Sequence, residues 1–301
     1  MVKRINTRYS ARWSDEDLDV LFLYNCHSGR QQYRAVVEAV VDEFEKNGAK
    51  ITTKKLDFVG SPFDDVSSVN LVVVAGGDGS VGYVVDAMQR EGIDLPLGII
   101  PAGTANDFAS MLGIPHNPRK AVQHILQTPI RKVDCGRVNG RYFVNIFSFG
   151  LFTTTSQRTF DSYKRLFGRL AYIVEGMREL RHIRLLPLRV DVGDGRFDFE
   201  AVLALVFNGH TAGRIPLASD AEYDDGLLDG LFFIRRRTLR LIFDALLYLC
   251  GGKPTSVLHI KSRSFRITST LSDIATDVDG QGGPTLPLDV ECLHQAIKIR
   301  G

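Results

Sequence analysis

Two glycine-containing segments, each preceded by a short apolar run, limit the fold of this 301-residue chain more than any other feature. The apolar run 71–75 leads into Gly76-Gly-Asp-Gly-Ser-Val-Gly82, and the run 97–100 leads into Pro101-Ala-Gly-Thr-Ala-Asn-Asp-Phe-Ala109. Continuous apolar runs of this length are typical of strands that are buried on both faces of a parallel sheet. Because parallel strands end at one sheet edge, where ligands bind, we expect the two segments to lie side by side.

The first half of the chain alternates strand-like and helix-like patterns. We predict strands at 19–24, 51–56, 71–75 and 97–100, and helices at 33–47 and 80–90, with a further helix starting at Asp107. The stretch 59–70 contains glycine, proline and serine and is a poor candidate for a helix. This alternation predicts a parallel sheet flanked by helices.

Beyond Asp134 strand-like runs dominate the chain. They lie at 141–149, 188–192, 197–208, 227–234, 257–268 and 286–299, with helical patterns at 166–180 and 238–250. Many strands punctuated by glycine and aspartate predict a second domain of β-sandwich type. We place the boundary near residue 136, which gives domains 1–136 and 137–301, with the last residues of the chain as candidates to rejoin the first domain.

Composition excludes several classes of protein. The 37 Lys and Arg against 35 Asp and Glu leave a net charge of +2, which argues against a protein that coats nucleic acid. The four cysteines lie far apart and lack zinc-site spacing, so we expect reduced thiols in the cytoplasm. No apolar run reaches the ~18 residues of a membrane-spanning helix, and the polar N-terminus lacks the apolar core of a signal peptide. We expect a soluble cytoplasmic protein that is able to dock on a membrane surface.

The segment 76–82 has the features of a phosphate-binding loop. Glycines at the end of a strand let the backbone approach a phosphate, and the following helix offers its N-terminal N–H groups to the negative charge. Gly77, Gly79 and Gly82 also spell the dinucleotide fingerprint G-x-G-x-x-G. Asp78 would repel a pyrophosphate directly above it, and no acid follows the next strand, which argues against a dinucleotide site. A plain glycine turn is the alternative that needs no ligand.

Two carboxylates distinguish these loops from a simple nucleotide cradle. Asp78 lies between the glycines, and Asp107 follows the neutral hydrogen-bonding residues Thr104 and Asn106. A carboxylate can hold Mg²⁺ through water or accept a proton from an attacking hydroxyl. Neither a Walker motif nor the protein-kinase motifs occur in the sequence. The pattern indicates phosphoryl transfer at a site of another kind.

These segments resemble the diacylglycerol-kinase catalytic family, the soluble lipid kinases that include sphingosine kinases and bacterial diacylglycerol kinases. The run 76–80 is similar to the family's G-G-D-G-[ST] motif, which NAD kinases and phosphofructokinases share, and 101–109 is similar to the more specific P-x-G-T-x-N-D-F-A. Further matches extend along nearly the whole chain: Asn25-x-x-Ser28-Gly29, Val133-Asp134-Cys-Gly136, Asn145 with Gly150, 168–172, Pro216 with Asp224-Asp225-Gly226-Leu-Leu-Asp229, and Asp279-Gly280.

The resemblance implies a fold, an activity and cofactors. The fold would be an α/β nucleotide-binding domain related to phosphofructokinase and NAD kinase, followed by a β-sandwich domain on the lipid side. The activity would be transfer of the γ-phosphate of ATP, with Mg²⁺, to the hydroxyl of diacylglycerol or a related lipid alcohol. The partner would be lipid at a membrane surface and not nucleic acid, and the sequence is compatible with a homodimer.

The resemblance also assigns site residues. Asp78, Asp107 and Asp134 would be needed for catalysis, and Asp225 would hold Mg²⁺ with its side chain, while Glu222 and Leu227 would contribute backbone carbonyls. Without the other motifs, the turn at 224–226 would read as a solvated hairpin. The nucleotide would be bound by Asn25, Ser28, Gly29, Gly76, Gly77, Asp78, Gly79, Ser80, Gly82, Thr104 and Asn106.

The sequence departs from the family where a base is expected. The family closes its site with Asp-Gly-Glu, whereas this chain has Asp279-Gly280-Gln281, and an amide cannot accept a proton from a lipid hydroxyl. We favour Asp279 as the base. The alternatives are an enzyme that works mainly by positioning and charge stabilisation, and a non-catalytic relative that binds nucleotide or lipid. An NAD kinase is the rival enzyme, although its Asn-Glu/Asp motif should lie deeper in the chain.

Overall fold

The structure is a computed structural model that describes residues 18–25, 30–64, 69–150, 185–213, 215–218, 221–235, 244, 247–248, 252 and 254–301. Contacts divide the chain into two units. The first comprises the described residues up to Val133 together with Ile297–Gly301, and the second comprises those within Asp134–Ala296. The first unit is a parallel α/β structure and the second is built of antiparallel strands, so the predicted fold class is confirmed.

The sheet of the first unit contains the four predicted strands. They are β1 (Asp19–Tyr24), β2 (Lys50–Lys55), β3 (Leu71–Gly76) and β4 (Leu97–Pro101), all parallel, in the order β4-β3-β1-β2. All six residues of β3 are buried, as its continuous apolar sequence predicts for a central strand. Gly76 pairs with Pro101, so the chain leaves β3 and β4 at neighbouring points of one sheet edge.

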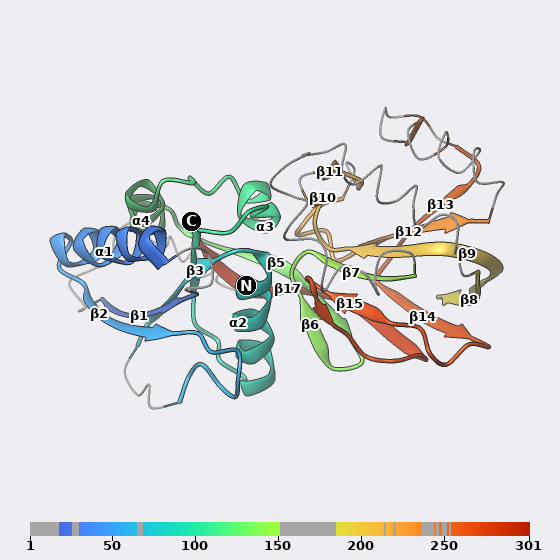
Figure 1. Ribbon diagram of the computed structural model, residues 1–301, viewed down its shortest axis with the longest axis horizontal. Helices are drawn as coiled ribbons and strands as arrows, with labels where there is room; N and C mark the ends of the chain where they lie inside the picture. The colour runs from blue at the N-terminus through green and yellow to red at the C-terminus, as the bar shows by residue number, and fades with distance from the viewer. Residues whose placement is uncertain are drawn as a thin grey trace, which may run out of the picture. The chain divides into compact units, whose positions relative to one another are not determined.

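In the described part of the first unit, four helices connect and cover these strands. They are α1 (Arg30–Lys46), α2 (Asp78–Glu91), α3 (Asp107–Met111) and α4 (Pro118–Gln127). Right-handed crossovers from β1 to β2 and from β3 to β4 run in opposite directions along the sheet, which places α1 and α2 on opposite faces. Figure 1 shows α1 and α4 together on one side of the strands and α2 on the other. The doubtful stretch forms no helix in its described parts, 59–64 and 69–70.

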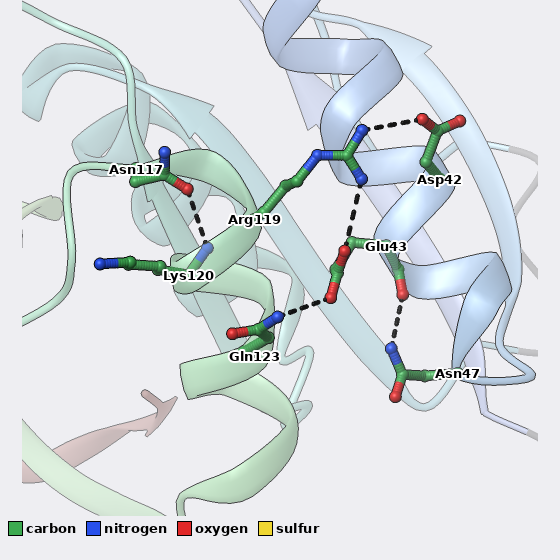
Figure 2. Close-up of polar contacts among 7 residues, drawn as sticks. All are labelled: Asp42, Glu43, Asn47, Asn117, Arg119, Lys120 and Gln123. Carbon is green, nitrogen blue, oxygen red and sulfur yellow. Dashed lines mark hydrogen bonds and ion pairs between the residues drawn. The ribbon is translucent and has the colours of Figure 1, made fainter.

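A polar cluster joins α1 to α4 (Figure 2). Arg119 of α4 donates to Asp42 at 3.0 Å and to Glu43 at 3.4 Å, and Gln123 donates to the other oxygen of Glu43 at 2.8 Å. The apolar faces of the two helices turn inward, with Val40, Val122 and Ile125 fully buried. The cluster therefore adds polar contacts beside an apolar interface, whose burial contributes most to the packing of the two helices.

The last described residues complete the first unit. Ile299 pairs with Leu97 at the free side of β4. Arg131 donates to the carbonyl of Gly301 at 2.6 Å, and the buried Arg300 donates to the carbonyl of Ile125 at 2.8 Å. The two hydrogen bonds join residues 300 and 301 to residues that lie 175 and 170 positions earlier in the sequence.

The second unit is an antiparallel array around a phenylalanine-rich core. Its buried rings include Phe143, Phe147, Phe149, Phe232 and Phe265, each of which stabilises the fold by roughly 1.5–3 kcal/mol through burial. The order β16-β15-β7-β9-β8-β14-β17 forms one path, while β12 pairs with β9 and β13. The strands are β5 (Ile130–Val138), β6 (Arg141–Phe143), β7 (Ile146–Gly150), β8 (Leu186–Val192), β9 (Gly195–Phe207), β10 (Thr211–Ala212), β11 (Ile215–Pro216), β12 (Leu228–Ile234), β13 (Val257–Ser262), β14 (Ser264–Ser269), β15 (Thr276–Val278), β16 (Gln281–Gly282) and β17 (Leu288–Arg300).

Two of the predicted strands are each divided in two. The run 141–149 forms β6 and β7, because the N–H groups of Val144 and Asn145 bond to the Asp279 carboxylate in place of a neighbouring strand. The run 257–268 breaks at Arg263, after which β14 pairs with β8 and β17 while β13 pairs with β12. The predicted helix 166–180 lies outside the described residues, as does most of 238–250. Within the described part of the chain, no helix is long and apolar enough to cross a membrane.

Candidate functional site

The predicted phosphate loop, residues 76–82, comprises the last residue of β3, Gly77 and the first turn of α2 in the first unit. Its glycines permit close backbone contacts. A Cβ at Gly76 would lie 2.4 Å from the Cβ of Ser80, and a Cβ at Gly103 would lie 2.3 Å from the Cα of Gly77. The N–H of Ala102 donates to the carbonyl of Gly76 at 2.9 Å. The two glycine segments therefore contact each other directly, as their positions at the ends of adjacent strands predict.

Asn106 shapes the second loop, residues 101–109. Its backbone adopts the left-handed conformation, with φ 54° and ψ 44°, in which asparagine is better tolerated than most residues. Its amide accepts from the N–H of Gly103 at 2.8 Å and donates to the carbonyl of Gly103 at 3.0 Å. The described contacts of this side chain therefore lie within its own loop, whereas Thr104 is exposed.

Asp78 connects the two loops through its carboxylate. One oxygen accepts a hydrogen bond from the backbone N–H of Phe108 at 2.9 Å. Burial raises the pKa of Asp78 above its ordinary value, the N–H groups of Phe108 and Asp107 oppose that rise, and the negative charge of Asp107 adds to it. The two predicted carboxylates of this edge are therefore close enough to interact.

Asn25 reaches the loop from the end of β1. Its side-chain amide donates to the hydroxyl of the buried Ser80 at 3.0 Å, and its backbone N–H donates to the carbonyl of Ala75 at 3.0 Å. Ser28 and Gly29 lie outside the described residues. The structure thus gathers at one sheet edge the predicted residues Asn25, Gly76, Gly77, Asp78, Gly79, Ser80, Gly82, Thr104, Asn106 and Asp107.

Asp134, in the second unit, anchors an acidic turn that we define as residues 222–227. The Asp134 side chain is fully buried, and its oxygens accept from the N–H of Gly226 at 2.6 Å and of Gln295 at 2.7 Å. His294 Nδ1 lies 2.9 Å from the same carboxylate. The backbone N–H of Asp134 donates to the carbonyl of Tyr223 at 2.7 Å. Asp134 therefore contacts the turn at two points, Tyr223 and Gly226.

Asp225, within the acidic turn, already contacts a cation from the protein. One carboxylate oxygen accepts from the N–H of Leu227 at 2.9 Å, and the other lies 2.7 Å from the ammonium of Lys261. The hydrogen bond with Asp225 is the largest of the causes that raise the pKa of Lys261, so this side chain stays charged at neutral pH. Asp229, two residues beyond the turn, is almost fully buried and lies 2.6 Å from His259 Nε2.

The acidic turn has the chemistry of a magnesium site but few side-chain ligands. Carboxylate and carbonyl oxygens suit Mg²⁺, which usually retains several waters, so Asp225 with the carbonyls of Glu222 and Leu227 fits this ion. Among the residues that the structure describes, no group of three or more His, Cys, Asp or Glu side chains could hold a metal. A magnesium ion at this turn would therefore depend on Asp225, whose oxygen Lys261 contacts.

Asp279 lies at the turn between β15 and β16. Its side chain is largely buried, and its carboxylate accepts from the N–H groups of Val144 at 2.8 Å, Asn145 at 3.1 Å and Ile146 at 2.9 Å. The residue is also left-handed, with φ 49°. Gln281 opens β16 and pairs with Val278. Asp279 thus holds the 144–146 segment, and its role as a base stays a prediction.

Sequence reasoning missed Asn208, Lys261 and His294. Asn208 is buried and donates to the carbonyls of Asp134 at 3.1 Å and Val144 at 2.9 Å, which connects the Asp134 network to the segment held by Asp279. Lys261 and His294 occupy strand positions with no distinguishing motif. The only available signal was Asn208-Gly209 at the end of a predicted strand.

Comparison with known proteins matches both units. Residues 19–138 match the diacylglycerol kinase catalytic domain, and residues 146–301 match the YegS C-terminal NAD kinase beta sandwich-like domain. The diacylglycerol kinase of Staphylococcus epidermidis is 30% identical over 92% of this chain and 90% of its own length. That of Bacillus subtilis is 29% identical over 92% of this chain and 94% of its own length.

Solved structures agree with the observed fold. The crystal structure of a putative diacylglycerol kinase from Bacillus anthracis aligns with a TM-score of 0.79 at 25% identity, and that of a diacylglycerol kinase from the same organism aligns with a TM-score of 0.75 at 24% identity. Each alignment covers 94% of this chain and 96% of the other. The likeness therefore extends over both units.

Proposed function

Because the chain belongs to the diacylglycerol kinase catalytic domain family, we propose that it is an ATP- and magnesium-dependent lipid kinase. Its substrate would be the hydroxyl of diacylglycerol or a related lipid alcohol, met at a membrane surface. The observation that carries the proposal is the edge of the first unit, where Asp78 joins the phosphate loop to the second loop through the N–H of Phe108. The diacylglycerol kinases at 28–30% identity support the same reaction.

Each part of the edge has a role in this proposal. The backbone of the phosphate loop would surround the phosphates of MgATP, with the positive end of α2 beside them. Thr104 would bond the nucleotide from an exposed position, and Asn106 would keep the second loop in shape. The Asp78 carboxylate would position the nucleotide's metal or the reacting hydroxyl. In the second unit, a resident Mg²⁺ held by Asp225 with the carbonyls of Glu222 and Leu227 would supply positive charge.

The missing base need not prevent the reaction. Phosphoryl transfer relies mainly on positioning and on stabilisation of charge, while general-base assistance contributes roughly 10²–10⁴-fold. Three backbone N–H groups already occupy the Asp279 carboxylate and stabilise its charged form. These contacts favour positioning and charge stabilisation as the main source of rate, with Asp279 as the proposed base to be tested.

Labelled ATP and a panel of acceptors test the proposed activity. The protein is incubated with diacylglycerol, monoacylglycerol or sphingosine in detergent micelles, and with NAD in parallel. We expect label in at least one lipid alcohol and none in NAD. Label in NAD alone would establish the rival enzyme, and nucleotide binding without transfer to any acceptor would indicate a non-catalytic relative.

Gln281→Glu is expected to raise kcat for the lipid acceptor by about tenfold or more, because it restores a carboxylate where the family has its base. The pKa of a glutamate, about 4.3 when unperturbed, leaves it ionised at neutral pH. Steady-state kinetics should show the gain in kcat with little change in KM for ATP. Gln281→Asn is the neutral control, and equal kcat in both variants would show that the absent carboxylate does not limit turnover.

A further inference from the structure

Three acids in or beside the acidic turn, the buried Asp134 and Asp229 and the partly buried Asp225, each contact a nitrogen of a side chain from the same unit. Asp134 contacts His294, and Asp229 contacts His259 at 2.6 Å. Asp225 contacts Lys261 at 2.7 Å. Burying a carboxylate is costly unless it is paired, so these partners keep the metal-free turn stable.

We propose that Lys261 is a built-in competitor of the divalent cation at the acidic turn: its ammonium occupies the Asp225 carboxylate, and it must leave when a metal ion binds there. The inference rests on the magnesium role proposed for Asp225. It adds a residue that lowers the affinity of the turn for metal and keeps the turn folded without it.

The backbone register holds Lys261 beside the acids. Lys261 lies directly opposite Asp229 in the antiparallel pair of β12 and β13. Its ammonium lies 2.7 Å from an oxygen of Asp225 and 3.9 Å from an oxygen of Asp229, and Glu222 is near enough to contribute attraction. His259 precedes it by two residues, so both basic side chains project from the same face of β13.

A metal ion at Asp225 and the ammonium in its present position would be two cations on one carboxylate. Mg²⁺ binds carboxylate oxygens at about 2.0–2.1 Å. Because one Asp225 oxygen accepts from the N–H of Leu227, the ion would need the other oxygen, which Lys261 now contacts. The ion would then strongly repel an ammonium that lies 2.7 Å from the same oxygen. The Lys261 side chain is 32% exposed, which leaves it a path into solvent. The turn therefore has two alternative arrangements, one with lysine and one with metal.

Manganese binding to the full-length, nucleotide-free protein tests the competition. Electron paramagnetic resonance measures free Mn²⁺ during titration of wild type, Lys261→Met and Lys261→Arg. We expect Lys261→Met to bind one Mn²⁺ at least about tenfold more tightly than wild type, as the loss of a close competing charge implies. Lys261→Arg keeps a cation at the turn and should bind as weakly as wild type. Lys261→Gln replaces Lys261→Met if that variant does not fold.

Lys298→Met is the matched control. Lys298 lies 2.6 Å from Asp94 with 31% of its side chain exposed, and the corresponding values for Lys261 and Asp225 are 2.7 Å and 32%. The affinity of Lys298→Met for Mn²⁺ should equal that of wild type. Equal affinity in wild type and Lys261→Met would overturn the proposal, as would tighter binding that persists when Asp225→Asn is added to Lys261→Met.

Thermal unfolding supplies a second readout. In the presence of a chelator, Lys261→Met should unfold at a lower temperature than wild type, because the acids of the turn lose a counter-charge. Addition of Mg²⁺ should restore the unfolding temperature of this variant. The unfolding temperature of wild type should change little with either the chelator or Mg²⁺. Since neither assay contains nucleotide or lipid, failure of the competition is distinguishable from failure of the kinase activity, which the labelled-ATP assay measures separately.

Discussion

Asp78→Asn is expected to lower kcat for phosphoryl transfer at least about a hundredfold, because it removes the charge that would position the nucleotide's metal or the reacting hydroxyl. The fold of the loops should survive. An asparagine oxygen can still accept the N–H of Phe108, which lies 2.9 Å from the carboxylate. Asp78→Ala is the paired variant, since it loses both the charge and this hydrogen bond. Steady-state kinetics and thermal unfolding of both variants separate the two contributions.

The stability of Asp78→Asn is expected to show the cost of the buried charge. Burial raises the folded-state pKa of Asp78 above its ordinary 3.8, so ionisation of this carboxyl destabilises the fold. At neutral pH Asp78→Asn should therefore be as stable as wild type or more stable, and the difference should vanish as the pH falls through the folded pKa toward 3.8. Near-wild-type kcat in Asp78→Asn would instead show that Asp78 serves only to connect the loops.

Asp279→Asn is expected to destabilise the second unit by roughly 1–3 kcal/mol, because an amide has a single acceptor oxygen and leaves at least one of the three N–H groups that the carboxylate now binds without an acceptor. The backbone is not the cause, since asparagine tolerates the left-handed φ of 49°. Urea denaturation followed by circular dichroism measures the loss. If Asp279 is also the base, kcat of the folded fraction falls by about 10²–10⁴-fold, and unchanged kcat would refute that role.

Asp277→Asn is the matched control for Asp279→Asn. Asp277 lies two residues earlier, and among the described residues its carboxylate accepts one hydrogen bond, from the N–H of Gly280 at 2.8 Å. Burial raises its pKa, so the ionised form destabilises the fold at neutral pH. The change to asparagine should therefore leave stability unchanged or raise it. Equal losses in the two variants would contradict the importance of the three contacts of Asp279.

Elements defined by neighbouring residues could be predicted from the sequence. The strand 19–24 was placed correctly, and α2 begins two residues before its predicted start, at the aspartate that follows Gly77. The two loops could be brought together without a structure because parallel strands end at one edge. The division of 141–149 could not, because its cause is a carboxylate more than 130 positions away in the sequence.

The partners of the predicted site residues depend on tertiary structure. Asp225 could be singled out within its motif, but the contact with Lys261 depends on the register of β12 and β13. Likewise, Asp134 could be matched to the family, whereas its contact with His294 joins residues 160 positions apart. Periodicity identifies which residues share a face of one strand, and it carries no information about the facing strand.

The return of residues 297–301 to the first unit affects the order in which the protein can mature on the ribosome. Domains generally fold as units, N-terminal first, while synthesis proceeds. Here the sheet partner of Leu97 and the carbonyl that Arg131 binds are synthesised only after all residues of the second unit. Until then the exposed side of β4 is an unpaired strand edge, which is a site for wrong association between nascent chains. The residues that complete the first unit are therefore available only after the second unit has been translated.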